Sequence, residues 1–160
     1  MATTGTRLKT TLPSNLEIML TREFDAPREL VFKAFTDPEL IPRWWGLRNS
    51  TTIVNTMEVR PGGAWRYISR GQNGEEYAFR GEYLEVVPPE RIVQTFEFEP
   101  MPGHIVTDSA TFEERDGKTI LTSTSTFDTK EERDGMIETG MEGGAAESYD
   151  RLEELLATLV

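Results

Sequence analysis

Few side chains in this sequence are suited to nucleophilic catalysis or to metal binding. The chain contains one histidine, His104, and no cysteine. Nucleophilic catalysis normally requires a Ser or Cys beside a base that a carboxylate orients, and zinc or non-haem iron requires several spaced ligands. His104 follows Pro102-Gly103 in a predicted turn, where we expect an exposed imidazole. We therefore predict no catalytic residue, no metal and no cofactor.

Acid–base chemistry by a carboxylate remains open, because an Asp or Glu in an apolar pocket needs no sequence motif. Asp108 and Glu58 would face inward only if the register of their strands differs from the one assigned here. We expect both on the solvated face. The segment Gly140-Met-Glu-Gly-Gly144 lacks the lysine and the preceding strand of a phosphate-binding loop.

Aromatic residues form the second group of candidates, because they recur at alternate positions of three predicted strands, 64–70, 76–87 and 91–99. Alternate residues of a strand point to the same side of a sheet. Charged residues at the opposite positions, such as Arg66, Arg80 and Glu97, indicate the solvated side. The aromatic side is either an ordinary packed core or the wall of a cavity.

The cavity interpretation gains support from a helix segment without bulky side chains, Gly140 to Ala146, which would lie opposite the aromatic side. Trp44 and Trp45 follow a short predicted helix and are placed either at the rim of a cavity or in the core. The predicted ligand-binding residues are Trp44, Trp45, Trp65, Tyr67, Phe79, Tyr83, Gln94, Phe96, Phe98, Met141, Ala145 and Tyr149.

The elements that would position these residues follow from hydrophobic periodicity and turn signals. Alternating apolar residues predict a strand over 16–24. Asp25-Ala26-Pro27 predicts a capped helix start, and Asp37-Pro38 a second short helix that ends before Gly46. Turn signals then divide the chain into strands at 51–59, 64–70, 76–87, 91–99, 105–114 and 118–127. Short connections require neighbouring strands to pair antiparallel, as a meander.

A long amphipathic helix closes the chain. Asp128 or Thr129 can cap its start, and apolar residues follow at steps of three and four as far as Leu159. Glycines predict a kink or break near 139–144. The helix must bury its apolar stripe against the sheet, and a sheet of seven strands curls around it. We predict an α+β fold in which a curved seven-stranded antiparallel sheet, with two short helices, wraps around this helix.

Composition narrows the class of partner and the organisation of the chain. The formal net charge is −11, which disfavours nucleic acid as a partner. We expect a flexible N-terminal arm over 1–15, one domain over 16–160, no membrane-spanning segment and a cytoplasmic location. The domain is expected to be a monomer or a homodimer.

Three segments resemble the START-like (SRPBCC) proteins similar to the C-terminal domain of the heat-shock protein 90 ATPase activator. The first, 21–46, begins Thr-Arg-Glu-Phe-Asp-Ala-Pro and ends Pro-Arg-Trp-Trp-Gly; the others are 79–93 and 148–156. The resemblance implies a helix-grip fold, shared with lipid-transfer domains and polyketide cyclases, with a pocket between sheet and terminal helix. Ala145 departs from the tryptophan that relatives often carry there, which would enlarge the pocket.

Three functions remain open at this point. The leading one is noncatalytic binding of a small apolar or aromatic molecule, including lipids. The resemblance also implies a protein-interaction module of the ATPase activator type, with a chaperone partner and a role in stress response. The third is an enzyme of the cyclase, dehydratase or hydrolase kind that uses a cavity carboxylate.

Overall fold

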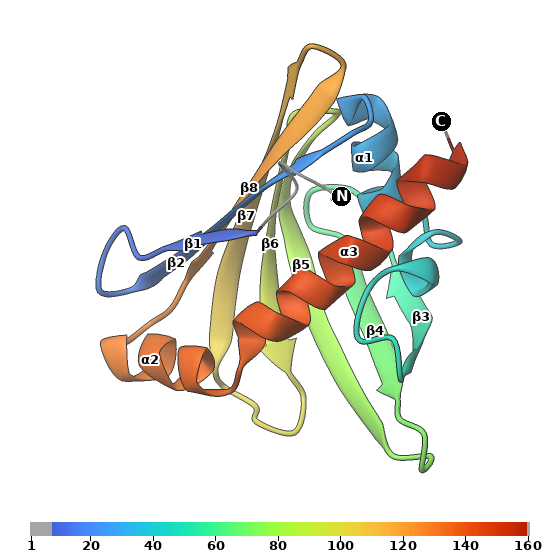
Figure 1. Cartoon of the computed structure of the whole chain (residues 1–160). Helices are drawn as coiled ribbons and strands as arrows, with labels where there is room; N and C mark the ends of the chain where they lie inside the picture. The colour runs from blue at the N-terminus through green and yellow to red at the C-terminus, as the bar shows by residue number, and fades with distance from the viewer. Residues whose placement is uncertain (1–7, 160) are drawn as a thin grey trace.

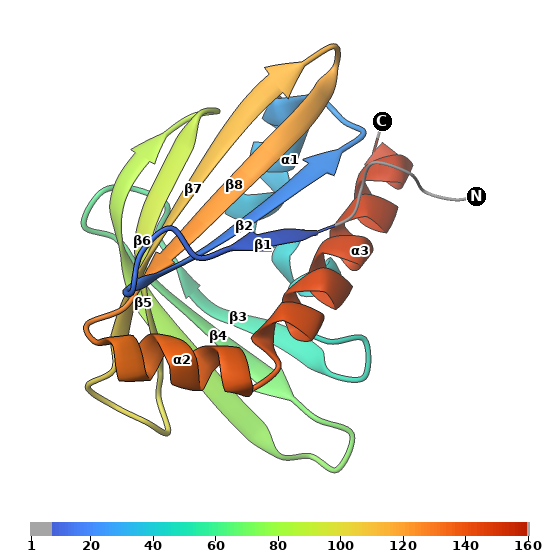
Figure 2. The same ribbon diagram turned by 60° about the vertical axis from the view of Figure 1, so that its left-hand side comes forward.

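The structure, a computed structural model, describes residues 8–159. One antiparallel sheet has the strand order β1-β2-β8-β7-β6-β5-β4-β3. Its strands are β1 (Lys9–Thr11), β2 (Glu17–Phe24), β3 (Thr51–Met57), β4 (Ala64–Arg70), β5 (Glu76–Val87), β6 (Arg91–Phe98), β7 (Ile105–Arg115) and β8 (Lys118–Thr126). The helices are α1 (Arg28–Thr36), the 3₁₀ turn η1 (Ile41–Arg43), α2 (Lys130–Glu138) and α3 (Met141–Leu159). Figures 1 and 2 show the curved sheet around one side of α3, with α2 at its N-terminal end. This α+β helix-grip arrangement confirms the predicted fold class.

The sheet has eight strands, one more than the sequence predicts. The added strand is β1, which pairs with β2 in the register Lys9↔Thr21 to Thr11↔Met19. Its sequence, Lys-Thr-Thr, has no apolar alternation, so periodicity gives no signal for it. Residues 9–11 of the expected N-terminal arm therefore belong to the sheet, and residues 1–7 lie outside the described residues.

The other strands follow their predicted segments to within two residues at each end. Turns with positive φ at Gly62, Gly74, Gly103 and Gly117 separate them, as the turn signals predict. The predicted solvated side carries ion pairs between neighbouring strands, including Arg80 Nε to Glu97 Oε1 at 3.0 Å. Strand period and turn chemistry thus agree along the meander.

The helix starts differ in how they are capped. Thr129 caps α2 as predicted, because its hydroxyl accepts a hydrogen bond from the Glu132 amide at 3.0 Å. The residue that precedes α1 is Pro27, and no side chain at that position caps the helix, contrary to the prediction for Asp25. Instead the Arg28 amide donates to the Glu114 carboxylate on β7 at 2.9 Å. The start of α1 is therefore capped by a side chain from a distant strand and not by a residue next to the helix.

The terminal amphipathic segment is two helices, α2 and α3, joined at Gly140. Gly140 has φ +82°, a left-handed conformation that favours glycine and ends α2. The break lies within the predicted range, and it turns α2 across the end of α3 (Figure 2).

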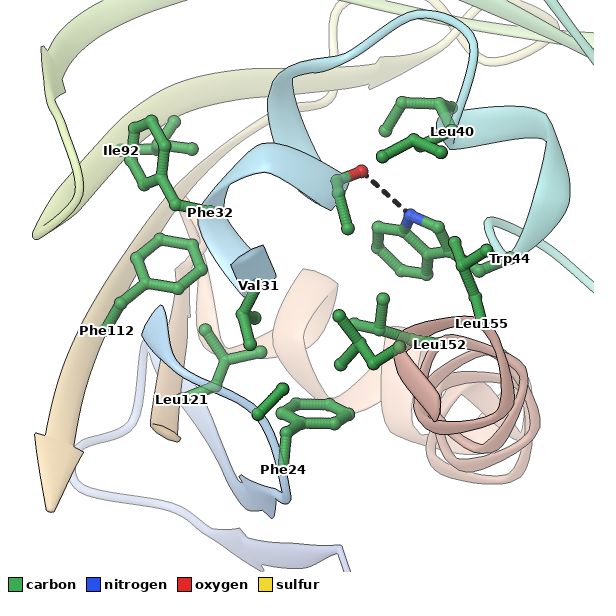
Figure 3. Close-up of a cluster of buried hydrophobic side chains, with 14 of the residues drawn as sticks. Phe24, Val31, Phe32, Leu40, Trp44, Ile92, Phe112, Leu121, Leu152 and Leu155 are labelled. Carbon is green, nitrogen blue, oxygen red and sulfur yellow. Dashed lines mark hydrogen bonds between the residues drawn. The ribbon is translucent and has the colours of Figure 1, made fainter. Parts of the chain in front are cut away.

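The core lies under the C-terminal half of α3. Leu152, Leu155 and Leu156 are buried there against Phe24, Leu121 and the aromatic residues of α1 and β7 (Figure 3). Trp44 joins this cluster and donates its indole N–H to the Ala34 carbonyl at 2.9 Å. Apolar side chains fill the space between helix and sheet at this end, which fixes the distance between them.

An ion pair between a buried arginine and an exposed aspartate also holds α3 to the sheet. Arg22 on β2 is 3% exposed and donates to Asp150 on α3 at 2.8 Å. The alternation of β2 places Arg22 on the inner side with Ile18 and Leu20, where a positive charge requires a partner.

Candidate functional site

A cavity of about 850 Å³ lies between the sheet and the N-terminal half of α3. The helix residues on its wall are Met141, Gly144, Ala145, Ser148 and Tyr149. Most of these side chains are small, whereas the leucines of the next turns fill the corresponding space. The unequal size of the side chains along α3 therefore separates a packed end from an unfilled end.

Aromatic rings form much of the opposite wall. The Trp45 ring meets the rings of Tyr67 and Phe79 edge to face, with centroids 5.1 and 5.2 Å apart. Phe79 lies beside Phe96 at 5.6 Å, and Phe96 beside Trp65 at 6.1 Å. These rings come from three adjacent strands, as the period-two pattern predicts, and from the segment after η1.

Trp65 keeps its orientation because the residue opposite it on β5 is a glycine, Gly81. Its indole N–H donates to the Thr95 carbonyl at 3.1 Å, across the position of Gly81. A Cβ at Gly81 would lie 1.9 Å from this carbonyl oxygen and 2.5 Å from the indole nitrogen. Only glycine therefore allows the ring to lie flat on the sheet at this point.

The structure brings together every predicted site residue on the cavity wall except Tyr83 and Phe98. Tyr83 is 1% exposed and lies in the core beside the wall, directly opposite Gln94 on the next strand. Burial raises the pKa of Tyr83 to about 12, which keeps this phenol protonated. Phe98 packs on the Phe79 ring at 5.1 Å, away from the cavity. Trp44 has both roles considered in the sequence analysis, since it is a core residue that also borders the cavity.

Asp108 lies on the cavity wall, contrary to the prediction that places it on the solvated face. It accepts a hydrogen bond from the Ser125 hydroxyl at 2.6 Å. Burial raises the pKa of Asp108 to about 6, and the bond from Ser125 only partly offsets this. The alternation of β7 contains the missed signal, because Val106 and Phe112 share the parity of Asp108 and are buried.

Further hydroxyls lie near this carboxylate. Ser123 and Tyr149 both border the cavity. Burial raises the pKa of Tyr149 to about 12, Asp108 adds to this shift, and a hydrogen bond with Ser123 opposes it. The Tyr149 ring packs edge to face on Phe24 at 5.8 Å, which fixes its position on α3. One part of an otherwise apolar cavity is thus polar.

Exposed residues mark where the cavity meets solvent. Gln72 and Asn73 in the β4–β5 turn border it, as do Thr139 and Gly140 at the α2–α3 junction. Both segments lie at the lower end of the molecule in Figures 1 and 2. These exposed residues form part of the rim where the cavity meets solvent.

The remaining candidates lie outside the cavity. The His104 imidazole is exposed and contacts the Glu132 carboxylate on α2. Glu58 is exposed and accepts a hydrogen bond from the Ala64 amide at 3.1 Å. Over residues 8–159 no cluster of His, Cys, Asp and Glu side chains is arranged to hold a metal ion. Within the same residues, no helix has the length and apolar character needed to span a membrane.

Solved structures with the same fold come from several bacteria. A protein from Rhodobacter sphaeroides is 24% identical, with a TM-score of 0.89, and the match covers 95% of this chain and 99% of that one. A protein from Mycobacterium smegmatis is 28% identical, with a TM-score of 0.83 and coverage of 94% and 96%. A protein from Staphylococcus epidermidis is 31% identical, with a TM-score of 0.81 and coverage of 95% of both chains. A comparison with curated proteins gave no match.

The sequence also matches one family profile over residues 25–157, which includes α1, strands β3 to β8 and nearly all of α3. The family is described as Activator of Hsp90 ATPase homolog 1-like protein. Sequence match, topology and cavity position agree with the START-like resemblance noted above, and the chain therefore belongs to this family.

Proposed function

We propose that this protein binds a small apolar or aromatic molecule in the cavity between the sheet and α3, without catalysing a reaction on it. The observation that carries the proposal is the unfilled volume of about 850 Å³ beside aromatic rings. Ordinary protein interiors leave few voids larger than a water molecule. Small-molecule pockets have volumes of about 300–1,000 Å³ and predominantly apolar walls.

The proposed contacts are the predicted residues that border the cavity. Trp45, Phe79 and Phe96 offer ring edges and faces to a flat guest, and Met141 offers a flexible apolar side chain. Tyr83 and Phe98 lie beside this wall on the same face of the sheet, opposite Gln94 and Phe79.

The test measures binding of N-phenyl-1-naphthylamine, a neutral apolar dye, by its fluorescence increase. Wild-type protein should bind the dye, and native mass spectrometry should detect a one-to-one complex. Ala145→Trp places an indole into the cavity and should weaken binding at least about tenfold, since it removes volume that the guest would occupy. No fluorescence increase with wild-type protein would overturn the proposal.

A matched control separates cavity filling from a general effect of a new tryptophan. Ala157 lies on the exposed side of the same helix, so Ala157→Trp should leave dye affinity within about twofold of wild type. Circular dichroism would verify that both variants fold.

The family description supports a second candidate, a protein-interaction module that stimulates the ATPase of a heat-shock protein 90 chaperone. The net charge of −11 would favour docking on a basic surface. A steady-state ATPase assay with saturating amounts of this domain is the test, and an unchanged rate would exclude this candidate.

The position of Asp108 keeps the enzymatic candidate open, because a carboxyl with a raised pKa suits general acid–base catalysis. Noncatalytic binding predicts that small molecules recovered from the protein are chemically unchanged. Mass spectrometric detection of a product formed by wild-type protein but not by Asp108→Asn would replace binding by catalysis.

A further inference from the structure

The cavity wall contains a row of polar side chains that binding of an apolar molecule does not explain. The strand register places Gln94 opposite Asp108, and Asp108 opposite Ser125. Directly opposed residues on one face of a sheet have Cβ atoms about 4.5–5.5 Å apart. All three border the cavity, and we call them the polar row.

The Asp108 carboxylate is incompletely satisfied within the described residues. Ser125 donates to its Oδ1 atom at 2.6 Å, and no other hydrogen bond or ion pair to this carboxylate occurs among residues 8–159. The buried cation on β2, Arg22, is directed to Asp150 and Glu153 of α3. The second carboxylate oxygen is therefore left for whatever occupies the cavity.

From this geometry we infer that the guest is an aromatic or apolar amine, with its ring system against Trp45, Phe79 and Phe96 and its ammonium group on Asp108. The inference rests on the proposed function and names the ligand class. An ammonium group supplies the missing hydrogen bond and also neutralises the buried charge. It also matches the remaining polar groups, because the Gln94 carbonyl and the Ser125 and Tyr149 hydroxyls can accept hydrogen bonds.

The same argument disfavours anionic guests such as fatty acids. A ligand carboxylate near Asp108 would place two like charges side by side, which raises the pKa of one of them or expels the ligand. The net charge of −11 adds a long-range preference for cations. At neutral pH Asp108 is mainly ionised, since its pKa is raised only to about 6.

The test compares three probes with the same naphthalene ring: 2-(1-naphthyl)ethylamine, neutral 1-ethylnaphthalene and 1-naphthylacetate. Isothermal titration calorimetry at about neutral pH gives the dissociation constant of each. We expect the amine to bind wild-type protein at least about tenfold more tightly than the neutral probe, and the acid to bind more weakly than the neutral probe. Asp108→Asn should reduce the preference for the amine to within about threefold and restore binding of the acid.

Glu113→Gln is the matched control, because it removes one negative charge from the exposed outer side of the same strand. It should leave all three affinities unchanged. If the neutral probe binds but Asp108→Asn does not alter the order of affinities, the inference is overturned while the proposed function stands. If N-phenyl-1-naphthylamine binds wild-type protein but none of the three probes does, the inference alone is overturned. If neither the dye nor any of the three probes binds, both the inference and the proposed function are overturned.

Discussion

At the scale of single residues, Asp108 provides a test of burial that does not depend on a ligand. Its pKa is raised from 3.8 to about 6 in the folded protein, so the folded state binds the proton more tightly than the unfolded state. The stabilising contribution of the protonated form is complete below about pH 4 and is lost as the pH rises through about 6. At higher pH the folded protein carries a buried anion that the unfolded chain solvates.

Asp108→Asn should therefore raise the free energy of unfolding at about pH 8 by about 1–2 kcal/mol. This value is smaller than the full pKa shift corresponds to, because water in the open cavity partly solvates the carboxylate. The gain over wild type should shrink as the pH is lowered from about 6 to about 4. Urea denaturation of both proteins across this range measures the difference. A difference that does not change with pH would contradict the raised pKa.

Gly81 gives a second prediction at this scale, because the indole of Trp65 packs directly against it. Gly81→Ala would place a methyl group 1.9 Å from the Thr95 carbonyl oxygen. We expect a loss of roughly 2–4 kcal/mol in the free energy of unfolding, since backbone and ring must both move. Gly143→Ala is the control: a Cβ there has no neighbour within 4 Å in a helix, so it should stabilise by about 0.4–1 kcal/mol.

The sequence predicts the apolar side chains of the site better than the polar ones. Trp65, Tyr67 and Phe79 follow from alternation alone, because their size and parity agree. The position of Asp108 in the alternation of β7 directs it inward, but its charge is typical of the surface. The sequence-based prediction relies on the charge and places Asp108 on the solvated face. Parity decides here because β7 has neighbours on both sides and cannot rotate its side chains outward without losing its pairing.

At the scale of elements, the ion pair between β2 and α3 determines how firmly the helix is held. Arg22→Ala should lower the free energy of unfolding by roughly 2–3 kcal/mol, because it leaves Glu153 partly buried without its cation. Partial exposure of Asp150 keeps the loss below that of a fully buried pair. Thermal or urea denaturation provides the measurement.

Lys118→Ala removes a partner from the exposed pair with Glu23, at 3.7 Å on the other side of the sheet. It should change stability by less than about 0.5 kcal/mol. Equal losses for the two variants would mean that Arg22 contributes no more than a surface charge.

The predicted meander is accurate at this scale because each strand is bounded by a turn that needs glycine or proline. β1 could not be predicted, since its pairing with β2 depends on the backbone and not on an apolar pattern. The orientation of α2 could not be predicted from the sequence either. Glycines indicate where a helix stops, but the direction of the next helix depends on packing between Met136, Phe127 and Leu20.

At the scale of the whole molecule, the division of α3 into a packed half and a cavity half should appear in its dynamics. Amides around Leu152 to Leu156 should exchange with solvent only through global unfolding, since these side chains are buried in the core. Amides of 141–148 should exchange faster, because few side chains pack against this turn.

Hydrogen exchange with and without a bound naphthyl probe measures both segments. Binding should slow exchange in 141–148 and leave 152–156 nearly unchanged. Uniform protection along α3 in the free protein would contradict a loosely packed N-terminal half. The sequence anticipates the small residues of this half but not the volume they leave, which depends on ring orientations set by contacts far apart in the chain.

If the cavity binds a guest as proposed, the residues that anchor α3 and those that select the guest lie on different turns of the helix. Leucines near its C-terminal end attach the helix to the sheet, and short side chains near its N-terminal end determine the shape of the space beneath it. Substitutions in the first turns of α3 should therefore change the shape of the cavity with little effect on the free energy of unfolding. Under the proposed function, such a scaffold would be able to change its guests during evolution while its architecture persists.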